Sequence, residues 1–329
     1  MIFKDKTILI TGGTGSFGTR FIERLLGEEH PPRTIRIFSR DELKQWNLQR
    51  RFADDDRLRY LIGDVRDRDR LVRATRGVDM IVHAAALKHV PVCEYNPFEA
   101  VQTNIHGAEN VVHAAIENDV PTTVNLSTDK AVNPVNLYGA TKLAAEKIVN
   151  QGNAYAADSP ARFSSVRYGN VVGSRGSVVP LFKQQAATGV ITITDERMTR
   201  FWITLDQAVQ FVVDSASRMG GGETFIPRIP SMRVTDMAAA LAPDAEIKII
   251  GIRPGEKLHE LLVTEDESRH AYETDNGFVI MPEYASWPLQ APANARALPG
   301  GFEYSSGDND QWLDVDELRG MTADVEAVV

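Results

Sequence analysis

The stretch "STDKAVNPVNLYGATK" (residues 127–142) groups side chains that suit catalysis. Tyr138 and Lys142 are four residues apart, so on a helix they lie on one face. A phenol with a pKa of about 10 is a poor base at pH 7. A neighbouring ammonium and an oxidised nicotinamide would lower that pKa. The phenolate could then take a proton from an alcohol as hydride leaves its carbon.

Asp129 and Lys130 are two further charged residues in the same stretch. A simple alcohol dehydrogenase needs only Tyr138, Lys142 and a hydroxyl such as that of Thr128. The additional pair directly follows a predicted strand, where functional side chains concentrate. A base that removes a C–H proton and an acid that protonates a leaving hydroxyl would together eliminate water. The alternative interpretation is a surface ion pair in a loop.

The stretch "TGGTGSFG" (residues 11–18) predicts a dinucleotide-binding turn. Gly12, Gly15 and Gly18 follow a predicted strand and open a predicted helix. Glycines let backbone N–H groups approach a pyrophosphate, and the helix N-terminus adds partial positive charge. Glycine clusters also occur in ordinary turns, but the strand before and the helix after favour dinucleotide binding.

The sequence "FSRDELK", at the end of the second predicted strand, indicates which dinucleotide is bound. Sites for NAD carry an acid there, which binds the ribose 2′-hydroxyl. Here Ser39 and Arg40 suit the 2′-phosphate of NADP, and Lys44 could add positive charge. Asp41 and Glu42 fit a solvated helix start equally well. We favour NADP over NAD.

The third and fourth predicted strands also end in candidate cofactor contacts. Asp64 and Val65 in "GDVRD" could flank the adenine. Ala84 belongs to a run of alanines in "HAAALKH", which lets the backbone pass close to a cofactor. A tightly packed strand end is the alternative for this run. The sequence predicts no metal site.

Short β-branched runs alternate with amphipathic segments through the first half of the chain, which predicts an α/β fold with a Rossmann-type doubly wound parallel sheet. Strands are expected at 7–11, 34–38, 58–63, 80–85, 122–127 and 163–168, and helices at 17–27, 96–118 and 138–157. This rhythm weakens after residue 168. We expect an NADP-binding domain at 1–168, joined by 199–228, and a discontinuous, smaller C-terminal α+β substrate lobe within 169–329.

Composition excludes several other classes of protein. The chain has 329 residues, 43% of them hydrophobic, and a net charge of −9 without a basic block, so nucleic-acid binding is not expected. No apolar run of membrane-spanning length occurs, and the N-terminus is not typical of a signal peptide. A lone cysteine, Cys93, allows no intrachain disulfide and favours a reducing, cytoplasmic setting.

The glycine turn together with YxxxK is typical of the short-chain dehydrogenase/reductase superfamily, and the length resembles its extended branch. Longer motifs resemble the UDP-N-acetylglucosamine 4,6-dehydratase (5-inverting) family, whose members start bacterial pseudaminic acid biosynthesis. These motifs are "SRDELKQ", "GDVRDRDRL", "HAAALKHVPVCEYNP", "STDKAVNPVNLYGATK", "RYGNVVGSRGSVVP", "MTRFWIT", "IPSMRVTDMA" and "GIRPGEKLHE". The resemblance runs from about residue 3 to 275 and resumes at 301–312, leaving 282–300 unmatched. Retaining dehydratases usually carry Asp–Glu where this chain has Asp129–Lys130.

The resemblance implies that Tyr138 takes the proton of the C4 hydroxyl, Lys130 removes the C5 proton and Asp129 protonates the departing C6 hydroxyl. The implied NADP contacts are Thr14, Gly15, Ser16, Phe17, Ser39, Arg40, Asp41, Glu42, Leu43, Lys44, Asp64, Val65, Ala84, Tyr138 and Lys142. The implied UDP-sugar contacts are Lys88, Leu126, Ser127, Asn170, Val178, Thr194, Arg253 and Glu256. The resemblance also implies a homo-oligomer, in particular a hexamer.

These assignments leave alternatives open. Arg253 suits a pyrophosphate, but a rim ion pair with Glu256 would explain it too. A UDP-sugar C4 epimerase or a retaining dehydratase is disfavoured by the Asp129–Lys130 pair. An NADP-sensing regulator is disfavoured because such proteins typically lose the tyrosine and lysine. For the elimination we expect a lowered pKa for Lys130, through Lys142, the oxidised cofactor and burial, and a raised pKa for Asp129 through burial.

Overall fold

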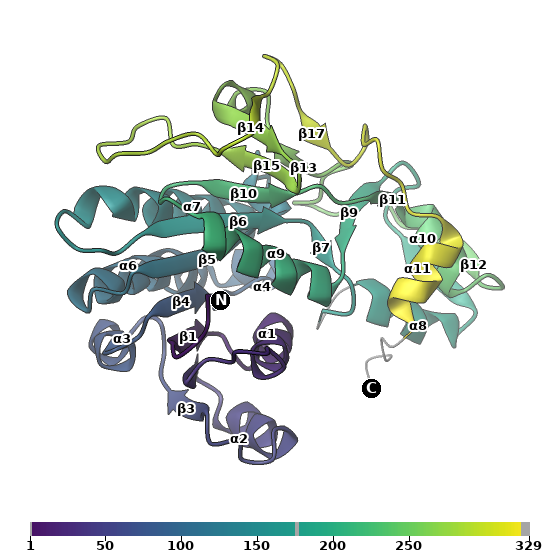
Figure 1. Cartoon of the computed structure of the whole chain (residues 1–329). Coiled ribbons are helices and arrows are strands. Elements are labelled where there is room, and N and C mark those ends of the chain that lie inside the picture. Colours follow the sequence, from purple (N-terminus) through teal and green to yellow (C-terminus); the bar gives the residue numbers. More distant parts are fainter. Residues whose placement is uncertain (1, 175–177, 324–329) are drawn as a thin grey trace.

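A ten-stranded sheet forms the centre of the molecule (Figure 1). The structure is a computed structural model that describes residues 2–174 and 178–323. Seven neighbouring strands are parallel, in the spatial order β3, β2, β1, β4, β5, β6, β10. They span Leu58–Ile62 (β3), Thr34–Ser39 (β2), Thr7–Thr11 (β1), Met80–His83 (β4), Thr122–Thr128 (β5), Phe163–Tyr168 (β6) and Thr224–Pro227 (β10). The order reverses beside β1, which is typical of a doubly wound Rossmann-type sheet, so the predicted fold class is confirmed.

Helices cover both faces of this sheet and define two hydrophobic layers. On one face lie α1 (Ser16–Leu26), α2 (Glu42–Arg51) and α9 (Leu205–Arg218); on the other lie α3 (Arg68–Thr75), α6 (Gly107–Glu117) and α7 (Leu137–Tyr155). In α1, the fully buried residues Phe21, Ile22 and Leu25 have the three- and four-residue spacing of a single helix face. Burying each such side chain stabilises the fold by about 1.5–3 kcal/mol.

The predicted helix 96–118 is divided in the structure. It consists of α5 (Pro97–Ala100), the π-helical segment η1 (Val101–His106) and α6, and it follows α4 (Val90–Tyr95). A π-helical turn inside a longer helix is uncommon and frequently lies at a functional site.

The C-terminal half contributes to the sheet as well as to a second lobe. Within the segment 199–228, β10 pairs into the Rossmann sheet and α9 packs on its face. In contrast, β9 (Thr199–Ile203) pairs with β7 (Asn170–Val171) and β11 (Ser231–Arg233) in a separate sheet. Beyond β10 the main sheet continues with antiparallel strands β15 (Gly277–Ile280), β14 (Ala271–Thr274) and β16 (Arg296–Ala297). The sequence analysis did not anticipate this extension.

The second lobe has a hydrophobic core of its own, to which Phe182, Trp202, Met237 and Leu318 contribute. Its elements are α8 (Val178–Ala186), β8 (Val190–Ile193), α10 (Val234–Leu241), β12 (Glu246–Ile249) and α11 (Val315–Thr322), and Figure 1 shows them to one side of the main sheet. The remaining elements are β13 (Leu261–Val263) and β17 (Tyr304–Ser305), which pair with each other, and the 3-10 helix η3 (Glu267–His270), which precedes β14. Within residues 2–174 and 178–323, no helix combines the length and apolar character needed to cross a bilayer.

Candidate active site

The glycine turn between β1 and α1 leaves space that side chains would fill. Gly12 has a φ of +67°, and a Cβ there would lie 2.9 Å from the backbone of Ala85. At Gly18, a Cβ would lie 2.5 Å from the Cα of Gly13. Gly15 is the N-cap of α1, whose first N–H groups therefore face the turn. This cradle, at the positive end of a helix dipole, fits a dinucleotide pyrophosphate.

A cleft of about 650 Å³ extends from this turn along the carboxyl ends of the parallel strands. Most of the predicted site residues line it. They are Gly12, Thr14, Gly15, Ser16, Phe17, Gly18, Ser39, Arg40, Asp41, Lys44, Asp64, Val65, Ala84, Lys88, Leu126, Ser127, Thr128, Lys130, Tyr138, Lys142 and Asn170. Residues far apart in the sequence thus meet at one edge of the sheet, where ligands of such folds bind.

In "SRDELK", the carboxylate of Asp41 is hydrogen-bonded to the helix that it precedes. Asp41 is the N-cap of α2: it accepts a hydrogen bond from the backbone N–H of Lys44 at 2.9 Å, and the Lys44 ammonium lies 3.1 Å away. The hydrogen bonds from Lys44 lower the pKa of the Asp41 carboxyl. Arg40 lines the cleft with its guanidinium 3.6 Å from Asp64. A cation therefore stands where a site for NAD would place a free carboxylate.

Helix α7 positions both residues of the YxxxK pair. Asn136 caps the helix by accepting a hydrogen bond from the N–H of Gly139 at 2.8 Å. A Cβ at Gly139 would lie 2.1 Å from the carbonyl oxygen of Lys130, so only glycine lets the 3-10 turn η2 (Asp129–Ala131) pack on the helix. Tyr138 and Lys142 both line the cleft, as their spacing predicts.

Asp129 and Lys130 form an ion pair at the end of β5, in which Asp129 is buried and the Lys130 side chain is 26% exposed. The carboxylate of Asp129 has no exposed surface. Its Oδ1 accepts hydrogen bonds from Thr128 Oγ1 at 2.8 Å and from Lys130 Nζ at 3.1 Å. Lys130 Nζ also donates to Asn170 Oδ1 at 3.4 Å. The interpretation of this pair as a surface ion pair is therefore wrong.

The charge state of Lys130 differs from the one expected. Burial acts to lower the pKa of its ammonium, but the negative charges of Asp129 and Glu260 outweigh burial, and the pKa is raised. The cation that acts to lower the pKa of Lys130 is Arg200, whereas the sequence analysis expected Lys142. The prediction of a lowered pKa was wrong for the protein itself: it left out the negative charge of the adjacent Asp129, which has the larger raising effect, and that of Glu260, which is distant in the sequence.

Tyr138 and Lys142 also differ from expectation. Burial raises the pKa of Tyr138 to about 12, against the opposing effects of the Lys130 cation and a hydrogen bond with Thr128. Lys142, which was expected to lower this pKa, is not among the groups that dominate it. Lys142 Nζ donates to the backbone carbonyl of Leu126 at 2.6 Å. Burial lowers the pKa of Lys142 itself to about 8.

Several predicted site residues do not line the cleft. Glu42 and Leu43 are exposed on α2, and Asp129 lies behind Lys130. In the second lobe these residues are Val178, Thr194, Arg253 and Glu256. Thr194 donates to the sulfur of Met198 at 2.9 Å, and Arg253 forms an ion pair with Glu256 at 3.8 Å. Among the described residues, no group of three or more His, Cys, Asp or Glu could hold a metal ion.

Comparisons with known proteins agree with this geometry. A family described as "Polysaccharide biosynthesis protein" matches residues 8–282. The UDP-N-acetylglucosamine 4,6-dehydratase (inverting) of Campylobacter jejuni subsp. jejuni serotype O:23/36 is 53% identical over 326 residues, covering 96% of this chain and 97% of its own length. The chain belongs to this dehydratase family. The resemblance seen in the sequence is thereby confirmed, together with the extended short-chain dehydrogenase/reductase fold.

Two other similar proteins put the dehydratase family in context. The structure of Pen from Bacillus thuringiensis is 41% identical, with a TM-score of 0.90, and the match covers 100% of both chains. The UDP-glucose 4-epimerase of Rickettsia conorii is 43% identical over 277 residues, covering 82% of this chain and 81% of its own. The dehydratase match exceeds the epimerase match in both identity and coverage.

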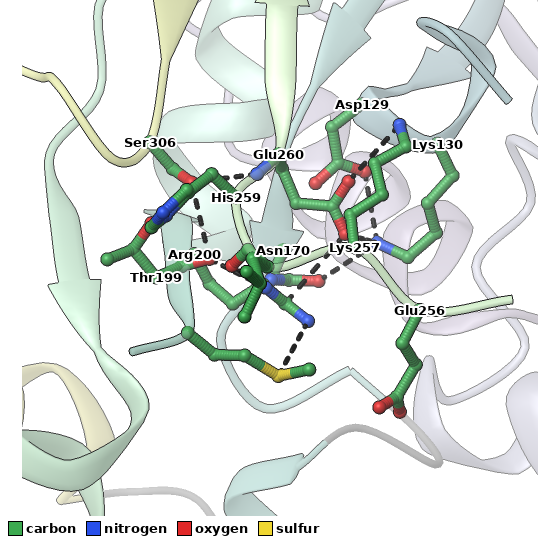
Figure 2. Close-up of polar contacts among 12 residues, drawn as sticks. Asp129, Lys130, Asn170, Thr199, Arg200, Glu256, Lys257, His259, Glu260 and Ser306 are labelled. Carbon is green, nitrogen blue, oxygen red and sulfur yellow. Dashed lines mark hydrogen bonds and ion pairs between the residues drawn. The ribbon is translucent and has the colours of Figure 1, made fainter. Parts of the chain in front are cut away.

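The structure adds residues to this dehydratase-type site that sequence reasoning missed. Asn104, in the π-helical segment η1, accepts a hydrogen bond from the N–H of Leu87 at 2.8 Å and donates to its carbonyl at 3.0 Å. It thereby fixes the loop that carries Lys88. Glu260, Arg200 and Lys257 gather behind Lys130, as Figure 2 shows. The π-helical turn has no simple sequence signature, and Glu260 lies 130 residues from Lys130 in the chain.

Proposed function

We propose that this protein is an NADP-dependent UDP-N-acetylglucosamine 4,6-dehydratase that inverts C5 and acts in nucleotide-sugar biosynthesis. The observation that carries the proposal is the ion pair between buried Asp129 and cleft-lining Lys130, beside Tyr138 at the dinucleotide cleft. A dehydrogenase has no use for this additional acid and base, whereas elimination of water needs both. The family membership of the chain supports the same reaction.

The chain's own residues suit a bound NADP. The glycine turn and the N-terminus of α1 would hold the pyrophosphate, Ser39 and Arg40 the 2′-phosphate, and Asp64 and Val65 the adenine end. When bound, NADP⁺ would accept hydride from C4 of the sugar and later return it to C6. Because hydride is returned, turnover consumes no cofactor.

The proton transfers of oxidation and elimination fall to side chains at the cleft. Tyr138 takes the proton of the C4 hydroxyl in its phenolate form, which the Lys130 cation and the hydrogen bond with Thr128 favour against the effect of burial. Lys130 Nζ, after giving its own proton to Asp129, removes the C5 proton, which the C4 ketone has made acidic. The Asp129 carboxyl gives its proton to the C6 hydroxyl, which leaves as water. A proton from solvent then reaches C5 on the opposite face, which inverts that centre, and Tyr138 releases to solvent the proton that it took from the C4 hydroxyl.

The UDP-sugar would span the two lobes. Lys88, Leu126, Ser127 and Asn170 line the cleft beside the proposed base. The other substrate residues carried over from the family lie in the second lobe and are Val178, Thr194, Arg253 and Glu256. The loop that contains Arg253 is held near α7, because Asn136 Nδ2 donates to the carbonyl of Gly255 at 2.8 Å. This contact supports Arg253 as a ligand of the substrate pyrophosphate.

Location and assembly follow from the family resemblance. We propose a cytoplasmic homo-oligomer, in particular a hexamer, in a pathway of the pseudaminic acid type. We assign NADP binding to 1–168 with 199–228, and UDP-sugar binding to the remainder of 169–329. The identity to named UDP-glucose 4-epimerases favours C4 epimerisation as the second candidate function.

Analysis of the product separates these functions. Purified protein is mixed with UDP-N-acetylglucosamine and a trace of NADP⁺, and the mixture is followed by NMR. The dehydratase yields a 4-keto sugar with a C6 methyl group. An epimer that keeps its C6 hydroxyl would show the second candidate instead, and an unchanged substrate would favour an NADP-sensing regulator.

A further inference from the structure

Glu260 is a buried carboxylate with no role in the reaction as described so far. It directly precedes β13 and is 3% exposed. Its backbone N–H donates to Ser306 Oγ at 2.9 Å, and its carbonyl accepts from the N–H of Ser306 at 2.8 Å. The backbone of Glu260 is therefore fixed independently of its side chain, which extends towards the Asp129–Lys130 pair (Figure 2).

Three cations surround the Glu260 carboxylate. Its Oε1 lies 3.8 Å from Lys130 Nζ and 3.8 Å from Arg200 Nε, and its Oε2 lies 3.5 Å from Lys257 Nζ. Among the described residues, Oε2 accepts no hydrogen bond. A buried carboxylate without such a bond persists only where charge compensates it. The position of Glu260 is thus stabilised mainly by the charges around it.

Two of these cations are held by contacts of their own. Arg200 donates to the carbonyls of Thr199 at 2.7 Å and of Leu258 at 3.1 Å. Lys257 donates to the carbonyl of Val132. Among the described residues, the ammonium of Lys130 contacts, in contrast, the side chains of Asp129, Asn170 and Glu260. Lys130 is the member whose position and charge depend on its acidic neighbours.

We propose that Glu260 is a positioning residue for Lys130, which fixes the amino group beside Asp129 and sets the pH range in which the pair shares one proton. The inference rests on the proposed function of Lys130 as the C5 base. The charged and titratable groups facing Lys130 are Asp129 from η2, Tyr138 from α7, Arg200 from β9 and Glu260. Lys257 faces the far side of Glu260.

The proton balance defines what Glu260 controls. The resting pair is an ammonium and a carboxylate, and the reactive pair is a neutral amine and a carboxylic acid. Both forms hold one shared proton, so the pair titrates as a unit. Product formation stops at high pH, where the shared proton is lost and Asp129 has none to give. The negative charge of Glu260 retains that proton, whereas Arg200 and Lys257 favour its release.

The variant Glu260→Gln tests the charge. Without the carboxylate, Arg200 and Lys257 are left uncompensated near Lys130, and the shared proton is lost more readily. In a plot of dehydration rate against pH, we expect the high-pH limb, where the rate falls, to move to lower pH by about one to two units. The rate below that limb should fall about tenfold, because the amino group is less well held. A limb at the wild-type pH in folded Glu260→Gln overturns the proposal.

Two further variants separate charge from position. Glu260→Asp keeps the charge but withdraws the carboxylate, so the limb should stay at the wild-type pH while the rate below it falls. Glu260→Gln combined with Lys257→Met restores the charge balance, so its limb should return towards wild type. If Glu260→Gln fails to fold, Glu260→Asp tests the positioning role in its place, and an unchanged rate in that variant overturns the proposal. Two results contradict the proposal. In one, the limb of the double variant stays at the pH found for folded Glu260→Gln. In the other, the limb of Glu260→Asp shifts as far as that of Glu260→Gln.

Glu223→Gln is a matched control. Glu223 is 4% exposed, precedes β10 at the opposite end of the sheet, and accepts hydrogen bonds from Ser164 Oγ and from the N–H groups of Gly220 and Gly221. Its replacement should lower thermal stability without moving the limb. If Glu223→Gln moves the limb as Glu260→Gln does, the effect is structural and the proposal fails.

An NMR titration keeps the inference distinguishable from the proposed function. The ¹³Cε signal of Lys130 is identified by its loss in Lys130→Met and followed with pH in the absence of substrate. It should titrate at lower pH in Glu260→Gln than in wild type. If wild type does not dehydrate UDP-N-acetylglucosamine but this shift occurs, the proposed function fails while the coupling of the two residues stands. An unshifted signal overturns the coupling itself.

Discussion

Lys130 carries its proton at neutral pH, because Asp129 and Glu260 raise the pKa of its ammonium. It can act as a base only after Asp129 has taken that proton. Replacing Lys130 by methionine keeps most of the side-chain volume and removes the amine. Exchange of the C5 hydrogen with D₂O, followed by NMR, should slow by about 10²–10⁴-fold. Affinity for NADP⁺ should be unchanged, and exchange at the wild-type rate would place the base elsewhere.

Asp129 should act twice: it first takes the proton of Lys130 and, once the C5 proton has been removed, gives that proton to the C6 hydroxyl. Asn in place of Asp129 preserves the shape of the fully buried side chain but has no carboxyl proton to give. We expect oxidation at C4 to proceed and loss of the C6 hydroxyl to stop. Absorbance of the reduced cofactor should then accumulate to at most one equivalent per site. A methyl group that still forms at the wild-type rate would show that another group is the acid.

Arg40 should determine the choice of cofactor. Its guanidinium lines the cleft, while Asp41 is engaged in capping α2. Arg40→Ala should weaken binding of NADP⁺ by about 1.5–3 kcal/mol, the scale of a hydrogen bond to a charged group, and leave NAD⁺ almost unaffected. Titration calorimetry measures both affinities. Tighter binding of NAD⁺ than of NADP⁺ by the wild-type protein would contradict this assignment.

At the scale of elements, the contact between η2 and α7 holds the acid–base pair beside Tyr138. A Cβ at Gly139 would lie 2.1 Å from the carbonyl of Lys130, closer than atoms can approach, so the turn or the helix must move. Gly139→Ala should therefore reduce kcat at least about tenfold and lower the melting temperature. Gly320→Ala, on exposed α11 with open space around it, should leave kcat unchanged and slightly raise stability. Equal effects of the two substitutions would argue against the contact.

Local patterns in the sequence were enough to predict the Rossmann strands and the placement of Tyr138 and Lys142 on one helix face. Each of these depends on neighbours within a few residues. The antiparallel extension by β14, β15 and β16 was not predicted: its strands are short, and although β14 and β15 form a tight hairpin, the hairpin joins the main sheet through β10, about 50 residues earlier in the chain. The raised pKa of Lys130 was missed in part for the same reason: beside Asp129, which has the larger effect, it depends on Glu260, which only the folded chain brings near.

At the scale of the whole molecule, a buried ion network ties the C-terminal segment to the sheet. Arg167 on β6 is 1% exposed and donates to Glu146 on α7, to Glu267 on η3 at 2.8 Å and to the carbonyl of Leu262 at 2.8 Å. Burial acts against the charge of the Arg167 guanidinium, but Glu146 and Glu267 outweigh it and raise the pKa. The network anchors the segment that begins with Glu260, so the reacting pair depends on contacts between both halves of the chain.

The central claim is that one protein oxidises C4, inverts C5 and reduces C6 without consuming cofactor. Substrate deuterated at C4 tests all three at once, with a trace of NADP⁺ and NMR analysis of the product. We expect deuterium in the C6 methyl group, a proton at C5 with inverted configuration and no accumulated NADPH. Deuterium lost to the cofactor pool, or a product with its C6 hydroxyl or its original C5 configuration, would contradict this claim.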